Sequence, residues 1–189
     1  MSFQTVSRSD WTWNHIRPVA FWVTTFVIVF ELAAGSVWNL MTIEWVEVQM
    51  RHLGYPYYFA YISGVWQAAA AAAIIAPRFP LLKEWAYAGI FFLWSGAAAS
   101  HLSASDSPET WGAPLMFLTF GIASWALRPA DRRLPGTRFG QDGASQTRPR
   151  AWAIPIGILV VLYVVSFLTL PAVEGVLHER AVELGWIGE

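Results

Sequence analysis

The fold is decided by residues 84–106, EWAYAGIFFLWSGAAASHLSASD, in which a long apolar run lies between charged residues. No charged side chain occurs from residue 85 to residue 100. A helix needs about 20 mainly apolar residues to cross the hydrocarbon core of a bilayer. The stretch therefore predicts a membrane-spanning helix that begins at Glu84, ends at the pair Ser100–His101 and is followed by Asp106.

The rest of the chain has the composition of an integral membrane protein. Of its 189 residues, 56% are hydrophobic and 13% are charged, whereas soluble domains have about 25% charged residues. Apolar runs at 19–40, 57–76 and 112–127 complete, with 84–106, a membrane-spanning four-helix antiparallel bundle. The run at 112–127 is short, so its helix is expected to be tilted less or to begin earlier. A fifth transmembrane helix is expected at 152–170, and the predicted fold class is all-α.

A short amphipathic helix is expected on the outer membrane surface between the first two spans. In residues 41–56, Ile43, Val46 and Met50 share one face at helical spacing. Gly54 stands where a left-handed residue would cap the helix. Such a helix lies in the membrane interface with its apolar face turned inward.

The chain changes character twice after the bundle. Residues 128–150 are rich in Arg, Gly, Pro and Ser, and they predict a flexible exposed loop. After the fifth span, the tail that follows Pro171 has an apolar face and is expected to form a second surface helix. Its LGW at 184–186 echoes LGY at 53–55, but two short matches are too few to argue an internal repeat.

The distribution of Lys and Arg predicts the orientation in the membrane, because cytoplasmic ends of spans carry an excess of these residues. Ten of the 12 lie at alternate ends of the spans and two lie at the opposite ends. We therefore expect a multi-pass protein of the bacterial inner (cytoplasmic) membrane, with the N-terminus in the cytoplasm and the C-terminus outside. The cytoplasmic group is Arg8, Arg17, Arg78, Lys83, Arg128, Arg132, Arg133, Arg138, Arg148 and Arg150, and the outer group is Arg51 and Arg180.

Several kinds of chemistry are excluded or unsupported by the sequence. The chain has no cysteine, which excludes disulfides, thiol redox catalysis, thiolate-bound zinc and iron–sulfur clusters. It lacks a phosphate loop, a nucleophile–base motif and a dinucleotide fingerprint, so a self-contained enzyme is not supported. No metal site is expected, because His52, His101 and His178 lie on separate elements without ligand spacing. No nucleic-acid partner is expected, because the arginine loop has no interleaved aromatic residues.

One polar side chain occurs near the middle of each span of the bundle. A carboxyl group within the hydrocarbon is costly when charged, so Glu31 should face the interior of the bundle. Gln67, Ser95 and Thr119 come from the other three spans at overlapping depths of roughly 12–20 Å. The four residues indicate one of two things. They form a small polar site for a quinone oxygen, a proton or a polar substrate, or they form interhelical hydrogen bonds that fix the register.

The pair Ser100–His101 is a second candidate, at the outer end of the decisive stretch. A histidine there could titrate near neutral pH, relay a proton, or donate a hydrogen bond to a quinone carbonyl. The alternative is an interfacial histidine that is paired with Asp106 or with a backbone carbonyl. The sequence leaves this choice open.

Four motifs give the chain a family resemblance. They are LGYP at 53–56, EWAYAG at 84–89, GAxxSH at 96–101 and WxLRP at 125–129. In this order and spacing, the chain resembles the DoxX-like family of small four-helix membrane proteins over about residues 16–133. It departs from many relatives in lacking an acidic residue in the second span and a lysine near the end of the first.

The resemblance implies a modest range of functions. Some relatives are subunits of membrane oxidoreductases, including thiosulfate:quinone oxidoreductase, and others act in the assembly of partner proteins. We therefore expect an accessory, quinone-facing subunit of a bacterial inner-membrane oxidoreductase complex, with quinone as the only cofactor suggested. The alternatives are a non-enzymatic membrane assembly or interaction protein and, third, a small-molecule carrier. The expected partners are the lipid bilayer and either a protein partner or a second copy of the chain.

The expected domain organisation combines the resemblance with the composition. A DoxX-like four-helix membrane domain occupies residues 1–133. A flexible Arg-rich cytoplasmic loop follows at 134–151. The fifth transmembrane helix and the amphipathic tail form residues 152–189.

Overall fold

The computed structural model describes residues 8–133 and 150–187, and the side chains of all of these except 8–15 and 131. Every element in these ranges is helical, which confirms the predicted all-α fold class. The described elements are α1 (Arg8–Met41), α2 (Glu44–His52), α3 (Tyr58–Ile75), α4 (Pro80–Ser103), α5 (Pro108–Leu127), the 3-10 turn η1 (Ala130–Arg132) and α6 (Arg150–Glu183).

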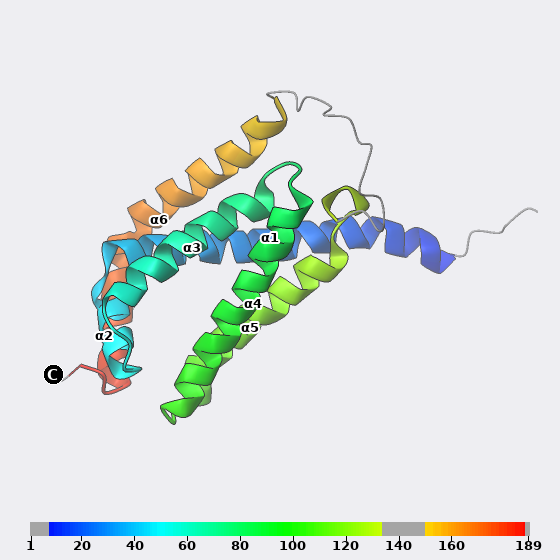
Figure 1. The fold of residues 1–189 in the computed structure, drawn as a ribbon. Helices are drawn as coiled ribbons and strands as arrows, with labels where there is room; N and C mark the ends of the chain where they lie inside the picture. Colours follow the sequence, from blue (N-terminus) through cyan, green and yellow to red (C-terminus); the bar gives the residue numbers. More distant parts are fainter. Residues whose placement is uncertain (1–7, 134–149, 188–189) are drawn as a thin grey trace, which may run out of the picture.

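Helix α1 is the axis around which the other long helices are arranged. It contacts α3, α5 and α6, and α4 contacts α3 and α5. Figure 1 shows α3 lying along α1, while α4 and α5 form a hairpin that leaves the bundle at an angle. Helices α1, α3, α4 and α5 follow one another in alternating directions, as an antiparallel bundle requires.

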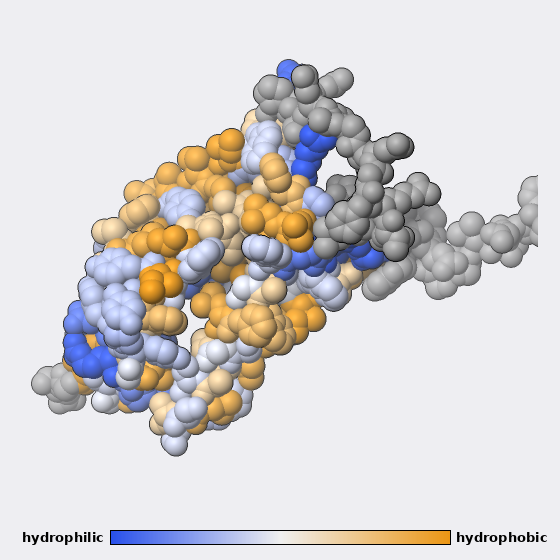
Figure 2. Space-filling view, viewed as in Figure 1, coloured by the Kyte–Doolittle hydropathy of each residue, from blue (hydrophilic) through white to orange (hydrophobic). Residues whose placement is uncertain are grey.

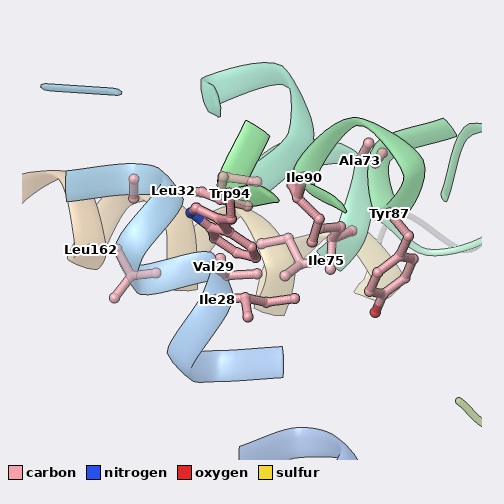
Figure 3. Packing of buried hydrophobic residues seen from close by; sticks show 13 residues of the cluster. Ile28, Val29, Leu32, Ala73, Ile75, Tyr87, Ile90, Trp94 and Leu162 are labelled. Atoms are coloured by element: carbon pink, nitrogen blue, oxygen red, sulfur yellow. The ribbon is translucent and has the colours of Figure 1, made fainter. Parts of the chain in front are cut away.

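The core of the bundle is built from aliphatic and aromatic side chains of four helices. Ile28 and Leu32 of α1 belong to one buried cluster with Ala73 of α3, Trp94 of α4 and Leu162 of α6 (Figure 3). The small Ala73 is only 7% exposed, and its size lets the α3 backbone approach its neighbours closely. The alanine-rich run therefore serves helix packing.

Two polar ends enclose the apolar middle of the molecule. On the face that Figure 2 shows, the strongly hydrophilic residues gather at two ends, with hydrophobic and intermediate residues between them. This distribution is typical of a membrane protein whose middle faces lipid. We name the arginine end after Arg17, Arg128, Arg132 and Arg133, and the histidine end after His52, His101 and His178.

Four described helices are long and apolar enough to cross a membrane: Ile16–Met41, Tyr58–Ile75, Pro108–Leu127 and Arg150–Glu183. Helix α4, which contains the decisive stretch, does not reach the same hydropathy, because its apolar run is diluted by Trp, Tyr, Ser and His. Its 24 residues still extend about 36 Å at 1.5 Å per residue. It runs from the arginine end to the histidine end beside α5, so it passes through the same apolar middle of the molecule.

Two helices extend beyond the predicted apolar runs. Helix α5 begins earlier than residue 112, which is one of the two expectations for this short run, because Pro108 at its first position suits a helix start. Helix α6 does not stop before Pro171 but continues to Glu183. Figure 1 shows α6 changing direction in its orange-to-red part. Proline removes one backbone hydrogen bond, so Pro171 bends this helix without ending it.

The predicted Arg-rich loop is only partly within the described residues. Residues 134–149 lie outside them. The last residues of the predicted loop, Arg150 and Ala151, are already helical. At the other side of the gap, Arg128 is buried and η1 is ordered against the bundle. The exposed loop therefore cannot begin at residue 128 as the composition indicated.

The echo between LGY and LGW has a structural meaning. Gly54 and Gly185 both have left-handed backbones, with φ of 75° and 70°. In each case the next residue donates its amide to a carbonyl five positions back, from Tyr55 to Met50 and from Trp186 to Ala181. Both are Schellman caps. The helix predicted within residues 41–56 is confirmed as α2 (Glu44–His52), and the same type of cap ends α6.

Candidate functional site

Helix α4 carries polar side chains at its two ends, of which Ser100 and His101 are predicted site residues and Glu84 is not. Glu84 lies near its start at the arginine end, and Ser100 and His101 lie in its last turn at the histidine end. Asp106 follows in the turn before α5, where its amide donates to the His101 carbonyl. Each end collects partners from other helices, and the two sets differ in charge and chemistry.

A buried ion pair joins α4 to α5 at the arginine end. Arg128 donates from Nη1 and Nη2 to the two carboxylate oxygens of Glu84, at 2.8 and 3.2 Å. Trp125 Nε1 donates to the same carboxylate at 3.0 Å. The Arg128 side chain is 4% exposed, and its guanidinium carbon lies 5.0 Å from the ring centroid of Tyr87. Such a bidentate pair fixes the relative placement of the two helices.

Other cations of the arginine end bind backbone carbonyls. Lys83 is 1% exposed, and its Nζ donates to carbonyls of the last turn of α3, at 2.8 Å for Ala73 and 2.9 Å for Ile74. It also donates to the carbonyl of Ala76. Arg132 donates to Ile74 O at 3.1 Å. These carbonyls have no partner within their own helix, and a cation is favoured at a helix C-terminus.

Three hydroxyl groups form a buried chain next to the ion pair. Ser124 Oγ lies 2.7 Å from Thr25 Oγ1 and 2.8 Å from the Tyr87 hydroxyl. The chain connects α5 to α1 and to α4. It satisfies three polar groups that would each be costly to bury alone.

A groove of about 660 Å³ runs along α4 and α5 from the same ion pair. Its walls are mainly aromatic, and Glu84 is the charged side chain among the residues that line it. Trp85 and Phe92, both of which line it, are 70% and 71% exposed, so the groove opens on the surface of the bundle. An amphiphile with a flat ring would match this combination of an aromatic wall and a polar end.

At the histidine end, one carboxylate bridges two imidazoles. His101 Nδ1 lies 2.7 Å from Asp106 Oδ2, and His52 Nε2 lies 2.8 Å from Asp106 Oδ1. Gln49 Nε2 lies 3.2 Å from the other ring nitrogen of His101. His101 is 3% exposed. Its pairing with Asp106, one of the two alternatives that the sequence left open, is therefore present.

The hydrogen bonds of this cluster define its charge. Burial alone would raise the pKa of Asp106, but the hydrogen bonds from His101 and His52 outweigh that effect and hold its pKa below the usual range. Asp106 is therefore an ionised acceptor at neutral pH. His101 Nδ1 then carries a proton that it donates to Asp106, and the Gln49 amide nitrogen lies opposite Nε2.

Aromatic residues that follow the two Schellman caps cover this cluster. The ring of Trp186 stacks on His52 with centroids 4.6 Å apart, and its centroid lies 6.0 Å from that of His101. Tyr55 takes the equivalent place after α2, and its hydroxyl lies 2.7 Å from Ser100 Oγ. Both caps therefore direct an aromatic residue to the last turn of α4.

The four polar residues predicted inside the bundle behave in two ways. Gln67 packs against α1 at Gly35, where an added Cβ would overlap Gln67 Oε1, and Glu31 lies one turn before Gly35 on α1. Ser95 and Thr119 instead donate to Phe91 and Leu115, four residues back in their own helices. The structure shows no hydrogen bond among the four in the part of the chain that it describes.

Several residues at the two ends were not predicted as site residues. His52 and Asp106 are far apart in sequence, so only their shared outer placement hinted at the bridge. Lys83 was counted as a surface cation, although the unpartnered carbonyls at the end of α3 were a signal for it. Gln49 and Trp186 gave no signal.

Among the described residues, no group of three His, Cys, Asp or Glu side chains is placed to hold a metal ion. At the histidine end, one nitrogen of His52 and one of His101 point at separate oxygens of Asp106, so they do not converge on one point. The third histidine, His178, is paired with Glu44 at 2.8 Å.

The comparison with known proteins agrees with the geometry. The sequence profile of the DoxX-like family matches residues 23–124, which is 102 of the 189 residues. The matched region contains α2, α3, α4 and most of α1 and α5, together with Glu84 and with His52, His101 and Asp106, whereas Arg128 lies just beyond it. No curated protein sequence and no solved structure matches this chain. The chain is a membrane protein that belongs to the DoxX-like family.

Proposed function

We propose that this protein is an accessory, quinone-facing subunit of a bacterial inner-membrane oxidoreductase complex. The observation that carries the proposal is the groove along α4 and α5, whose aromatic walls lead to the pair Glu84–Arg128. A membrane quinone combines a flat ring with a long apolar tail. It carries electrons and protons between redox proteins of a membrane.

The residues of the groove fit such a head group. Glu84 lines the groove, and Arg128 lies behind it and holds its two carboxylate oxygens. A carboxylate oxygen is an acceptor, and Glu84 would accept a hydrogen bond from the hydroxyl group of a reduced quinone at this end. Trp85 and Phe92 would contact the ring, and the open side of the groove leaves the tail in lipid.

An accessory role fits the side chains of the chain better than an independent enzyme. A quinone site needs a source of electrons, and the absence of cysteine leaves no thiol, thiolate-bound metal or iron–sulfur cluster to supply them. A partner protein would carry that centre. The DoxX-like relatives that serve as oxidoreductase subunits support this division of labour.

A non-enzymatic interaction protein is the second candidate, and one observation favours it. Gly89 and Gly96 lie two turns apart on α4, and an added Cβ at either position would meet nothing within 4 Å. A helix surface of small residues allows another helix to approach closely in lipid. A partner that purifies in stoichiometric amounts without quinone would support this candidate over the first.

The test of the quinone proposal is to fill the groove. Ala88 lines the groove and is exposed, so Ala88→Trp places a ring where the quinone would bind. A steric conflict of this kind costs about 1–3 kcal/mol, which corresponds to a roughly 5- to 150-fold loss of affinity. We expect the amount of quinone that copurifies in mild detergent, measured by extraction and mass spectrometry, to fall accordingly.

The matched control is Ala153→Trp, an exposed alanine of α6 that lies outside the groove. It should retain quinone at the wild-type level. Equal quinone content in the two variants, or a wild-type protein without quinone above the level of bulk extracted lipid, would refute the proposal.

We also propose that the arginine end faces the cytoplasm. Its support is the gathering of Arg17, Arg128, Arg132 and Arg133 at one end, opposite His52, His101 and His178. A reporter fused to the C-terminus should be active only outside the cytoplasm. Activity confined to the cytoplasm would reverse the orientation.

A further inference from the structure

The histidine end has a cavity that the proposed quinone site does not use. It has a volume of about 680 Å³ and lies where α2 and α4 end. Polar and apolar surfaces contribute to its lining in similar amounts. The polar side chains that line it are His52, Tyr55, Ser100 and Ser103.

The hydroxyl groups that line the cavity use their hydrogens in hydrogen bonds within the protein. Ser100 Oγ donates to the Gly96 carbonyl at 2.9 Å, so the Tyr55 hydroxyl, 2.7 Å away, donates to Ser100. Ser103 Oγ donates to the Ala99 carbonyl at 2.8 Å. A hydroxyl group has one hydrogen and two lone pairs. These three groups therefore present oxygen lone pairs to a ligand.

The imidazole of His52, which also lines the cavity, is held by Asp106. Asp106 is an ionised acceptor, so His52 Nε2 carries a proton and donates to it at 2.8 Å. Asp106 itself adds a negative charge next to the cavity.

The C-terminal ends of two helices add negative electrostatic potential at this cavity. Helix α2 ends at His52, and Leu53 follows as its C-cap. Helix α4 ends at Ser103, and Ala104 follows as its C-cap. A helix C-terminus carries a partial negative charge, which favours a cation. Both C-termini border the cavity, and residues of both caps line it.

We propose that this cavity binds a small organic cation with N–H donors, such as a primary ammonium group. Its hydrogens match the lone pairs of Tyr55, Ser100 and Ser103. Its charge matches the two helix C-termini and the Asp106 carboxylate. The ring of Tyr55, stacked on Phe59 at 4.8 Å between centroids, offers an aromatic face that a cation also favours.

Three probes of similar size separate the parts of this proposal. 1,4-Diaminobutane carries charge and N–H donors, 1,4-butanediol carries donors without charge, and tetraethylammonium carries charge without donors. Isothermal titration calorimetry of the purified full-length protein in detergent should show saturable binding of the diamine only. Binding of the diol as tightly as the diamine would overturn the proposal, and so would tetraethylammonium binding as tightly as the diamine.

A pair of tyrosine variants ties the binding to this cavity. Tyr55→Phe removes one acceptor from the lining and is expected to weaken diamine binding by about tenfold, the usual effect of a hydrogen bond to a charged group. Tyr57→Phe removes a hydroxyl at the same end, from a ring that does not line the cavity, and should bind as the wild type does. Equal affinities in the two variants, with unchanged melting temperatures, would refute the assignment.

Discussion

Replacing Lys83 with methionine is expected to lower the free energy of unfolding by about 3 kcal/mol or more, although the side-chain volume hardly changes. The ammonium group donates to the carbonyls of Ala73, Ile74 and Ala76 at the end of α3, and Lys83 is 1% exposed. Each buried acceptor left without a partner costs about 1–3 kcal/mol. Methionine has no donor, so the carbonyls of Ala73 and Ala76 would lose the hydrogen bond from Lys83 at a site that water reaches poorly. Ile74 O would keep its bond from Arg132.

The matched variant Lys83→Arg keeps the charge but changes its shape. A planar guanidinium directs its donors in a fixed fork, whereas an ammonium directs three from one point. We expect Lys83→Arg to recover only part of the lost stability. Unfolding in detergent, followed by tryptophan fluorescence, measures both variants. If Lys83→Met unfolds like Arg51→Met, in which a 69% exposed cation is removed, the capping role is wrong.

Replacing Arg128 with alanine is expected to cost about 2–4 kcal/mol. Removal of one partner from a buried ion pair costs about 3–5 kcal/mol, because the remaining charge is left uncompensated. The Glu84 side chain is 25% exposed, so solvent reduces this penalty. Arg128→Ala also removes the hydrogen bond that Arg128 Nε donates to the Trp125 carbonyl at 2.8 Å. Unfolding in detergent, followed by tryptophan fluorescence, measures the free energy of unfolding of this variant as well.

Two controls separate the ion pair from general packing. In the double variant Arg128→Met with Glu84→Gln no charge is left alone, so it should be more stable than Arg128→Ala. At the other end, Arg51→Ala breaks an exposed pair with Glu47 at 2.7 Å and should cost only about 0.3–0.5 kcal/mol. A loss as small as this for Arg128→Ala would show that the buried pair contributes no more than a surface pair.

The sequence predicted the long helices well because the length of an apolar run is itself a physical requirement of the bilayer. It also offered the pairing of His101 with Asp106 as one of its alternatives, since the two residues are only five positions apart across a single turn. The bridge to His52 could not be predicted in the same way. It depends on how α2 docks against the end of α4, which no local pattern describes.

The polar residues inside the spans show a different limit. A serine or threonine in a membrane helix can donate to the carbonyl four residues back, so it needs no partner on another helix. Ser95 and Thr119 do this, and their presence in apolar runs therefore does not predict a shared site. Gln67 has no such local solution, and its amide does pack against α1.

The cover that Trp186 provides has a consequence for the order of biogenesis. His52 and His101 belong to helices that precede α6 in the chain, and N-terminal parts fold first during synthesis. Until α6 is inserted and turns at Pro171, the two imidazoles have no indole ring stacked on them. The histidine end is therefore open in a newly inserted bundle, and it closes only when the late helix docks.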